Sequence, residues 1–271
     1  MLVGSGLAYG DDVFRWDAFL WALLGAIAIQ VAANFANDVS DARRGADTPE
    51  RLGPPRMVAR GEIAERQMWT AVWLAVAVAG VAGVALTMIA GPVILLIGVS
   101  SVIAMLAYVG GPAPYGYRGL GELFTFVFFG LVATVGSRFV HDMTAPLAAW
   151  LLAIPIGMLV TAILVVNNLR DLETDAAAGK RTLAVILGAD VTMTVYTSLV
   201  LGAFGLIALF AIVGWTPQLT ALAALAAPAA AGPVRTVYRE TGSTLNRVLR
   251  VTARLHLATG AAMALAAAIS G

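Results

Sequence analysis

The sequence predicts an all-α, polytopic transmembrane helix bundle, and three observations support this fold class. Of the 271 residues, 60% are hydrophobic and only 12% are charged, which is about half the charged share of an ordinary soluble domain. Apolar stretches of about 20 residues, each long enough to cross a hydrocarbon core, recur along nearly the whole chain. Gly and Pro residues separate several of these stretches as tight connections. The even distribution indicates a single transmembrane domain over residues 1–271.

Eight stretches are expected to form complete helices, with boundaries good to a few residues. They cover residues 17–38, 68–90, 92–109, 118–140, 146–170, 189–213, 216–238 and 246–270. Upstream, Met1 to Gly10 is apolar but only about half as long as a span requires, so we count it as a truncated first helix. The absence of cysteine excludes disulfides, thiolate zinc sites and cysteine nucleophiles.

Basic residues are distributed unequally between the two sides of the predicted bundle. With the truncated helix counted as the first, fifteen of the 17 basic residues follow the second, fourth, sixth and eighth spans or lie at their ends. Only Arg15 and Arg138 lie on the opposite side. Because Lys and Arg concentrate in cytoplasmic connections, we expect the basic side to be cytoplasmic, in a protein of the cell's inner membrane.

Two clusters of acidic and amide residues end spans on this same side. Within each cluster, spacings of three or four residues put the side chains on one helix face. The members are Asn34, Asn37 or Asp38, and Asp41 in the first cluster, and Asn167, Asp171 and Asp175 in the second. The two helix ends are therefore expected to converge on one cavity.

The composition of these clusters indicates a metal and a diphosphate. Carboxylates near membrane depth are costly unless paired or coordinated, which makes them functional candidates. Oxygen donors without His or Cys select a hard cation, and Mg²⁺ needs only a few carboxylates plus substrate phosphate oxygens. Mg²⁺ and nearby cations would stabilise a departing diphosphate, and the apolar interior would shelter the resulting allylic carbocation from water. The alternative is helix-end charges that pair with neighbouring arginines and bind no ligand.

Four segments carry a resemblance to a known family: AANFANDVSDARRGAD, RLGPPRMVARG, PYGYRGLGELFTFVFFG and NNLRDLETDAAAGKRTLAV. In these segments the chain resembles the UbiA family of intramembrane aromatic prenyltransferases, and within it the branch that acts on dihydroxynaphthoate in menaquinone synthesis. The resemblance implies a nine-helix bundle around a central cavity, in which two Asp-rich motifs bind two Mg²⁺ and a polyprenyl diphosphate beside an aromatic acceptor. It also implies that 1,4-dihydroxy-2-naphthoate loses CO2 as it is prenylated, giving demethylmenaquinone and diphosphate.

The resemblance further implies roles for individual residues. The catalytic positions are Asn34, Asp38 and Asp41 in the first motif and Asp171 and Asp175 in the second, and the four aspartates are also metal ligands. Many relatives have a third acid four residues after Asp41, where this chain has Gly45, so Asp47 is the remaining candidate ligand. The candidates for substrate binding are Arg44, Arg56, Arg60, Tyr115, Asn167, Lys180 and Arg181.

Two residues of the third segment have more than one interpretation. Tyr115 alone would belong to an interfacial aromatic belt, whereas the resemblance makes it a cavity residue whose π face contacts the carbocation or the acceptor. Glu122 either neighbours the acceptor or pairs with Arg118 at a spacing of four residues. Glu122 is therefore left out of the predicted catalytic residues.

Alternatives remain for the start of the chain and for the function. Relatives carry a complete helix before the segment that matches Gly4 to Tyr9, so either the start is misassigned or the chain is shortened. A prenyltransferase for another acceptor, such as 4-hydroxybenzoate, is one alternative function. A cation-coupled transporter is another, but acids at helix ends beside Arg and Lys suit an anionic ligand better. No basic aromatic patch indicates nucleic acid binding.

Overall fold

The computed structural model describes residues 1–45, 52–53, 56–111 and 114–271. Within these ranges all regular secondary-structure elements are helical. The long helices are α2 (Trp16–Arg43), α3 (Glu65–Ala90), α4 (Pro92–Val109), α7 (Leu147–Arg170), α10 (Ala189–Ile212) and α12 (Leu245–Ala268). The shorter elements are α1 (Leu2–Gly10), η1 (Tyr115–Tyr117), α5 (Gly121–Thr125), η2 (Phe126–Val132), α6 (Ala133–Asp142), α8 (Leu172–Ala177), α9 (Leu183–Leu187), η3 (Gln218–Ala230), α11 (Ala231–Val237) and η4 (Gly242–Thr244). The predicted all-α class is confirmed.

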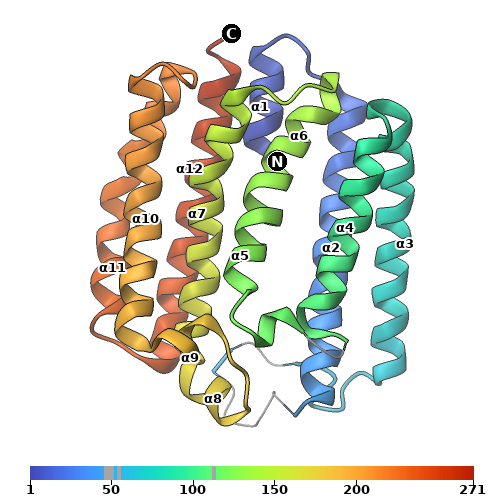
Figure 1. The fold of residues 1–271 in the computed structure, drawn as a ribbon, viewed down its shortest axis with the longest axis vertical. Coiled ribbons are helices and arrows are strands. Elements are labelled where there is room, and N and C mark those ends of the chain that lie inside the picture. Colours follow the sequence, from blue (N-terminus) through green and yellow to red (C-terminus); the bar gives the residue numbers. More distant parts are fainter. Residues whose placement is uncertain (46–51, 54–55, 112–113) are drawn as a thin grey trace.

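Six helical segments of the described chain are long and apolar enough to cross a membrane, and Pro92–Tyr108 is a shorter apolar helix. These seven segments match seven of the predicted spans. The remaining span, 216–238, consists of the 3₁₀ helix η3 followed by α11, and each of these two elements contains a proline that cannot donate a backbone hydrogen bond. Figure 1 shows the long helices aligned along the vertical axis, with α8 and α9 at the lower end of the bundle.

Helix α1 is short, and it packs tightly between α6 and α12. A Cβ added to Gly4 would lie 2.2 Å from the carbonyl oxygen of Thr134, and one added to Gly6 would lie 2.3 Å from that of Ala264. Only glycine permits this approach of backbones, which is the usual means of close helix packing in lipid.

Helix α7 is the most enclosed of the long helices. In its most apolar stretch 61% of the residues are buried, against 22% in α2 and in α3. It contacts α10, α12 and η2, and its buried side chains form much of the main hydrophobic core. A helix in this position carries its C-terminal polar residues to the interior of the bundle.

The span over residues 121–142 is interrupted by the π-helix η2. Short π-helical stretches within α-helices are frequent at functional sites. Here the segment contacts α7 through two glycines, since a Cβ added to Gly130 would lie 2.4 Å from the Cα of Gly157. The contact fixes η2 against the central helix.

We therefore expect Gly130→Ala to lower the free energy of unfolding by about 1–3 kcal/mol, because the added methyl group overpacks a backbone contact. Gly80→Ala is the matched control, since a Cβ at that helical position meets no atom within 4 Å. Thermal unfolding in detergent measures both variants. Equal melting temperatures for the two would contradict the contact.

Candidate active site

A polar cavity of about 380 Å³ lies where the two predicted clusters meet. Most of its polar lining comes from α2, from the end of α7 and from α8. Tyr108 of α4 and Thr125 of α5 also contribute. The polar side chains are those of Gln30, Asn34, Asn37, Asp41, Arg56, Tyr108, Thr125, Asn167, Asn168, Asp171, Thr174, Asp175 and Lys180. Residues more than one hundred positions apart in the sequence thus share one cavity, as their spacing predicted.

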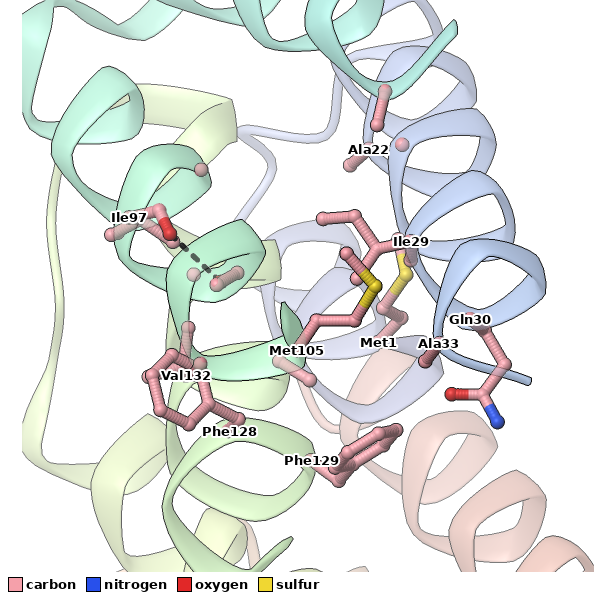
Figure 2. Close-up of a pocket in the computed structure, with 18 of the residues that line it drawn as sticks. Met1, Ala22, Ile29, Gln30, Ala33, Ile97, Met105, Phe128, Phe129 and Val132 are labelled. Atoms are coloured by element: carbon pink, nitrogen blue, oxygen red, sulfur yellow. Dashed lines mark hydrogen bonds between the residues drawn. The ribbon is translucent and has the colours of Figure 1, made fainter. Parts of the chain in front are cut away.

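An apolar cavity of about 360 Å³ adjoins the polar one. Its wall includes Ile29 and Met105 and the π-helical Phe128 and Phe129, which Figure 2 shows as sticks. Glycines at positions 83, 98 and 136 also line it. The residues common to both cavities are Gln30, Asn34, Asn37, Tyr108, Thr125 and Phe129. A ligand with a charged head and a hydrocarbon tail would cross the junction that these residues form.

Asp41 lies within α2, which continues to Arg43 instead of ending at residue 38 as predicted. Its carboxylate is buried, accepts a hydrogen bond of 2.9 Å from the Tyr117 hydroxyl, and lies 3.5 Å from Nη2 of Arg56. Burial and the negative charge of Asp41 raise the pKa of Tyr117, so this hydroxyl remains a donor. The carboxylate of Asp41 therefore lies between a phenol that donates to it and a guanidinium.

The second cluster surrounds the end of α7, which stops at Arg170. Asp171 connects α7 to α8 with φ −93° and ψ 9°, so the helix ends at residue 170 as predicted. The four-residue hydrogen-bond spacing continues across this connection, and Asn167, Asp171 and Asp175 all line the polar cavity. The buried guanidinium of Arg170 donates to both carboxylate oxygens of Asp171, to Asn167 Oδ1 at 3.0 Å and to Asn246 Oδ1 at 2.8 Å. Arg170 thereby sets the positions of two cavity residues.

The pKa of Asp175 is affected by the other acidic groups of the cavity. Burial raises its pKa to about 6; Lys180, whose Nζ lies 3.7 Å from Oδ1, opposes the shift, while the charges of Asp171 and Asp41 add to it. The carboxylates of α2 and α8 are thus near enough to repel each other. A cation between them would relieve this repulsion.

Asp38 does not line either cavity. It is buried at the end of α2, and its two carboxylate oxygens accept backbone N–H groups from Met57 at 3.1 Å and Val58 at 3.0 Å. These hydrogen bonds hold Met57 and Val58 against α2. The structure therefore places this predicted metal ligand in a structural contact.

The basic candidates divide into two groups. Arg56 and Lys180 line the polar cavity, and Arg44 lies beside it, with its guanidinium carbon 5.3 Å from the centre of the Tyr117 ring. Arg60 is exposed and pairs with Glu62 at 3.6 Å. Arg181 is also exposed, so neither Arg60 nor Arg181 reaches the cavity in this structure.

Two further candidates remain. Tyr115 lines the apolar cavity, and its ring stacks on Phe124 with centroids 3.9 Å apart, so the structure places it toward the hydrocarbon part of the site. Asp47 lies outside the described residues.

The oxygen donors of the cavity fit a hard cation. Besides Asp41 and Asp175, they include Oδ1 of Asn37, which is buried without a hydrogen-bond partner in the described chain. Within the same described residues, no three His, Cys, Asp or Glu side chains could hold a metal by themselves. Mg²⁺ does not require such a cage, because it is commonly bound through one or two carboxylates, with water and substrate phosphates completing its shell.

Three site residues were not found by sequence reasoning. Tyr117 lies two residues after Tyr115 in the same segment, and nothing in the pattern singles it out as the donor to Asp41. Arg170 had a detectable signal, since it follows Asn167 by three residues and directly precedes Asp171. Asn168 was visible only as the second residue of an Asn pair.

A helical membrane bundle in which an acid-lined polar cavity joins an apolar one defines an intramembrane enzyme for a ligand with an anionic head and a lipid tail. The chain belongs to the UbiA prenyltransferase family, whose model matches residues 1–267. It is thus an integral membrane prenyltransferase.

Two curated relatives and two solved structures show how far the similarity extends. The 1,4-dihydroxy-2-naphthoate octaprenyltransferase of Mycobacterium tuberculosis is 37% identical, over 89% of this chain and 86% of the relative. That of Escherichia coli is 36% identical, over 89% and 80%. The apo UbiA homolog from Aeropyrum pernix has a TM-score of 0.69 at 15% identity, covering 96% of this chain and 95% of that one. The Archaeoglobus fulgidus homolog bound to GPP and Mg²⁺ has a TM-score of 0.62 at 14% identity, over 97% and 94%. At such low identity, the two structures establish the common fold.

Replacing Arg170 with Met tests how the second cluster is held. Removing one partner of a buried ion pair leaves the other charge uncompensated, so we expect a loss of about 3–5 kcal/mol in the free energy of unfolding. Arg60→Met, which breaks an ion pair whose arginine side chain is 58% exposed, should change stability by less than about 1 kcal/mol. Thermal unfolding in detergent with both variants measures the difference, and equal effects would refute the assignment.

Proposed function

We propose that this chain, acting as one domain over residues 1–271, transfers a polyprenyl group from polyprenyl diphosphate to 1,4-dihydroxy-2-naphthoate with loss of CO2. The observation that carries the proposal is the junction of the two cavities, where Asp41 and Asp175 face a space continuous with an apolar one. The choice of acceptor is supported by the names of the relatives, which cover most of the chain. The Mg²⁺ and the prenyl diphosphate are supported by the solved homologs bound to GPP or DMAPP with Mg²⁺.

The polar cavity would bind the diphosphate. Arg56 and Lys180 can meet phosphate oxygens, the first as a planar fork and the second as a point charge. Asp41, Asp175 and Asn37 are the residues that would hold Mg²⁺, which when bound neutralises negative charge on a departing diphosphate. Asp38, Asp171 and Asp47 remain candidate ligands from the family resemblance.

The proposed reaction consists of a simple sequence of bond changes. The allylic C–O bond breaks with its electron pair leaving on diphosphate, and the ring carbon that bears the carboxylate forms the new C–C bond. Departure of the carboxyl group as CO2 returns a bonding pair to the ring. Both hydroxyl groups are retained, so the immediate product is the quinol form of demethylmenaquinone.

The apolar cavity would protect the positive charge that develops on the allylic carbon. Its wall near the junction carries the rings of Tyr115, Phe124 and Phe128, and aromatic faces attract a cation within about 6 Å. An apolar wall also keeps water from capturing the allylic group. The prenyl tail would then lie among the small and apolar side chains of α2, α3 and α4.

The distribution of basic residues supports an orientation with the polar cavity on the cytoplasmic side of the inner membrane. Arg44, Arg56 and Lys180, which lie in or beside that cavity, belong to the basic side of the chain. Both substrates would then reach the site from the side of the membrane on which the chain carries most of its Lys and Arg residues.

Asp41→Asn and Asp175→Asn should each reduce prenyl transfer by about 100-fold or more, because each removes a charge aimed at the metal and diphosphate. Asp190→Asn, a matched change at an exposed position of α10, should leave the rate unchanged. Transfer of a labelled prenyl group by purified protein measures all three. Wild-type rates in the Asp41 and Asp175 variants would remove the proposed site.

The product of the reaction tests the acceptor. With dihydroxynaphthoate labelled in its carboxyl group and a defined prenyl diphosphate, we expect release of labelled CO2 in equal amount to diphosphate, and a product whose mass lacks the carboxyl group. Mass spectrometry and trapping of CO2 measure both. A product that retains the label, or a preference for 4-hydroxybenzoate, would contradict the assignment.

A further inference from the structure

A buried carboxylate that the mechanism does not use lies behind the junction of the two cavities. Glu122, the second residue of α5, is 6% exposed and lines neither cavity. Its Oε1 accepts a hydrogen bond of 2.8 Å from Nδ2 of Asn168, whereas its Oε2 is buried without a hydrogen-bond partner among the described residues. The predicted pairing with Arg118 is not among the ion pairs of the described chain. Burying such a group costs free energy, which calls for a functional explanation.

The partner of Glu122 does reach the site. Asn168 of α7 lines the polar cavity, on a wall that also contains Thr125, Phe129 and Leu164. Apart from its amide this wall is largely apolar, as the face of an aromatic ring requires. The same cavity is lined by Asp41 of α2.

The hydrogen bond to Glu122 fixes what Asn168 can offer. Oε1 of Glu122 accepts from this side chain, and an amide has a donor end and an acceptor end. Glu122 therefore binds the NH2 group of Asn168, and the carbonyl oxygen remains for the cavity. Without this partner the amide could rotate and present a donor instead.

From this arrangement we infer that Asn168 accepts a hydrogen bond from a phenolic hydroxyl of the aromatic acceptor, and that Glu122 is a positioning residue that keeps the amide in the accepting orientation. The inference rests on the proposed prenyl transfer to an aromatic acceptor. It assigns an acceptor-binding wall to α5, η2 and α7, in the cavity that Asp41 of α2 also lines. The neighbouring ring of Tyr108 lines both cavities and packs beside Gly121, so it closes this wall toward the apolar side.

Two variants of Glu122 separate positioning from other roles. Glu122→Gln keeps an oxygen that accepts from Asn168, so the KM for dihydroxynaphthoate should stay within about threefold of wild type. Glu122→Met keeps a similar length but cannot accept, and the KM should rise about tenfold, which corresponds to the loss of one hydrogen bond. In both variants the KM for the prenyl diphosphate should change by less than about twofold, because Glu122 orients Asn168, whereas Arg56 and Lys180 would meet the diphosphate.

Thr161→Val is the matched control on α7. The Thr161 hydroxyl is also buried without a partner in the described chain, but it lines neither cavity. Its loss should leave both KM values unchanged. Equal impairment of the Gln and Met variants would show that the charge itself is required and would overturn the positioning role. Parallel changes in both KM values, or no change in the Met variant, would overturn it as well.

A measurement on the wild-type protein keeps the inference testable if Glu122→Met does not fold. Of the two acceptors in which one hydroxyl of dihydroxynaphthoate is methylated, at least one should show a KM about tenfold higher than the parent, since a methyl ether cannot donate. Unchanged KM values for both ethers would refute the inference. If the wild type prefers 4-hydroxybenzoate, the proposed acceptor fails, and the same comparison is made with that phenol. If it prenylates no aromatic acceptor, the proposed function and the inference both fail.

Discussion

The burial of carboxylates that two distant helices bring into one cavity is the constraint on which the site depends. Asp41 and Asp175 would be costly neighbours if nothing compensated them. The chain supplies partial compensation through the Tyr117 hydroxyl, the Arg56 guanidinium and the Lys180 ammonium. A divalent cation and a diphosphate, bound together, could balance the charges of the cavity that remain uncompensated. The affinity of the cavity for its ligands and its cost to the folded protein thus have the same origin.

The long helices could be predicted because the bilayer imposes a length and a composition on each of them. The convergence of the two polar clusters could also be predicted, since helical spacing and the side of the membrane restrict where Asp41 and Asp171 can lie. The 3₁₀ helix η3 could not, because an apolar run of alanines satisfies the same length rule whether its backbone is α-helical or more tightly wound. Span boundaries at the helix ends were similarly uncertain, and α2 proved to be longer than its apolar run.

Individual roles within the site were less accessible than its location. Asp38 and Asp41 are three residues apart and look equivalent in the sequence, yet one binds backbone N–H groups and the other faces the cavity. The difference arises because Met57 and Val58 donate to Asp38, and no spacing rule predicts which residues meet that carboxylate. Likewise, Asn168 becomes informative only through Glu122, 46 positions away. Contacts of this kind depend on tertiary packing, and a single sequence shows them only as residue types.

The apolar cavity owes part of its volume to glycines, which have no side chain to fill it. A Cβ at Gly83, Gly98 or Gly136 would meet no atom within 4 Å, and all three glycines face that space. They contrast with Gly130, where backbone crowding allows nothing larger. Replacing these glycines by larger residues could therefore shorten or narrow the apolar cavity one carbon at a time without disturbing the helix contacts. A descendant enzyme could adapt to a different lipid before any of its charged residues changed.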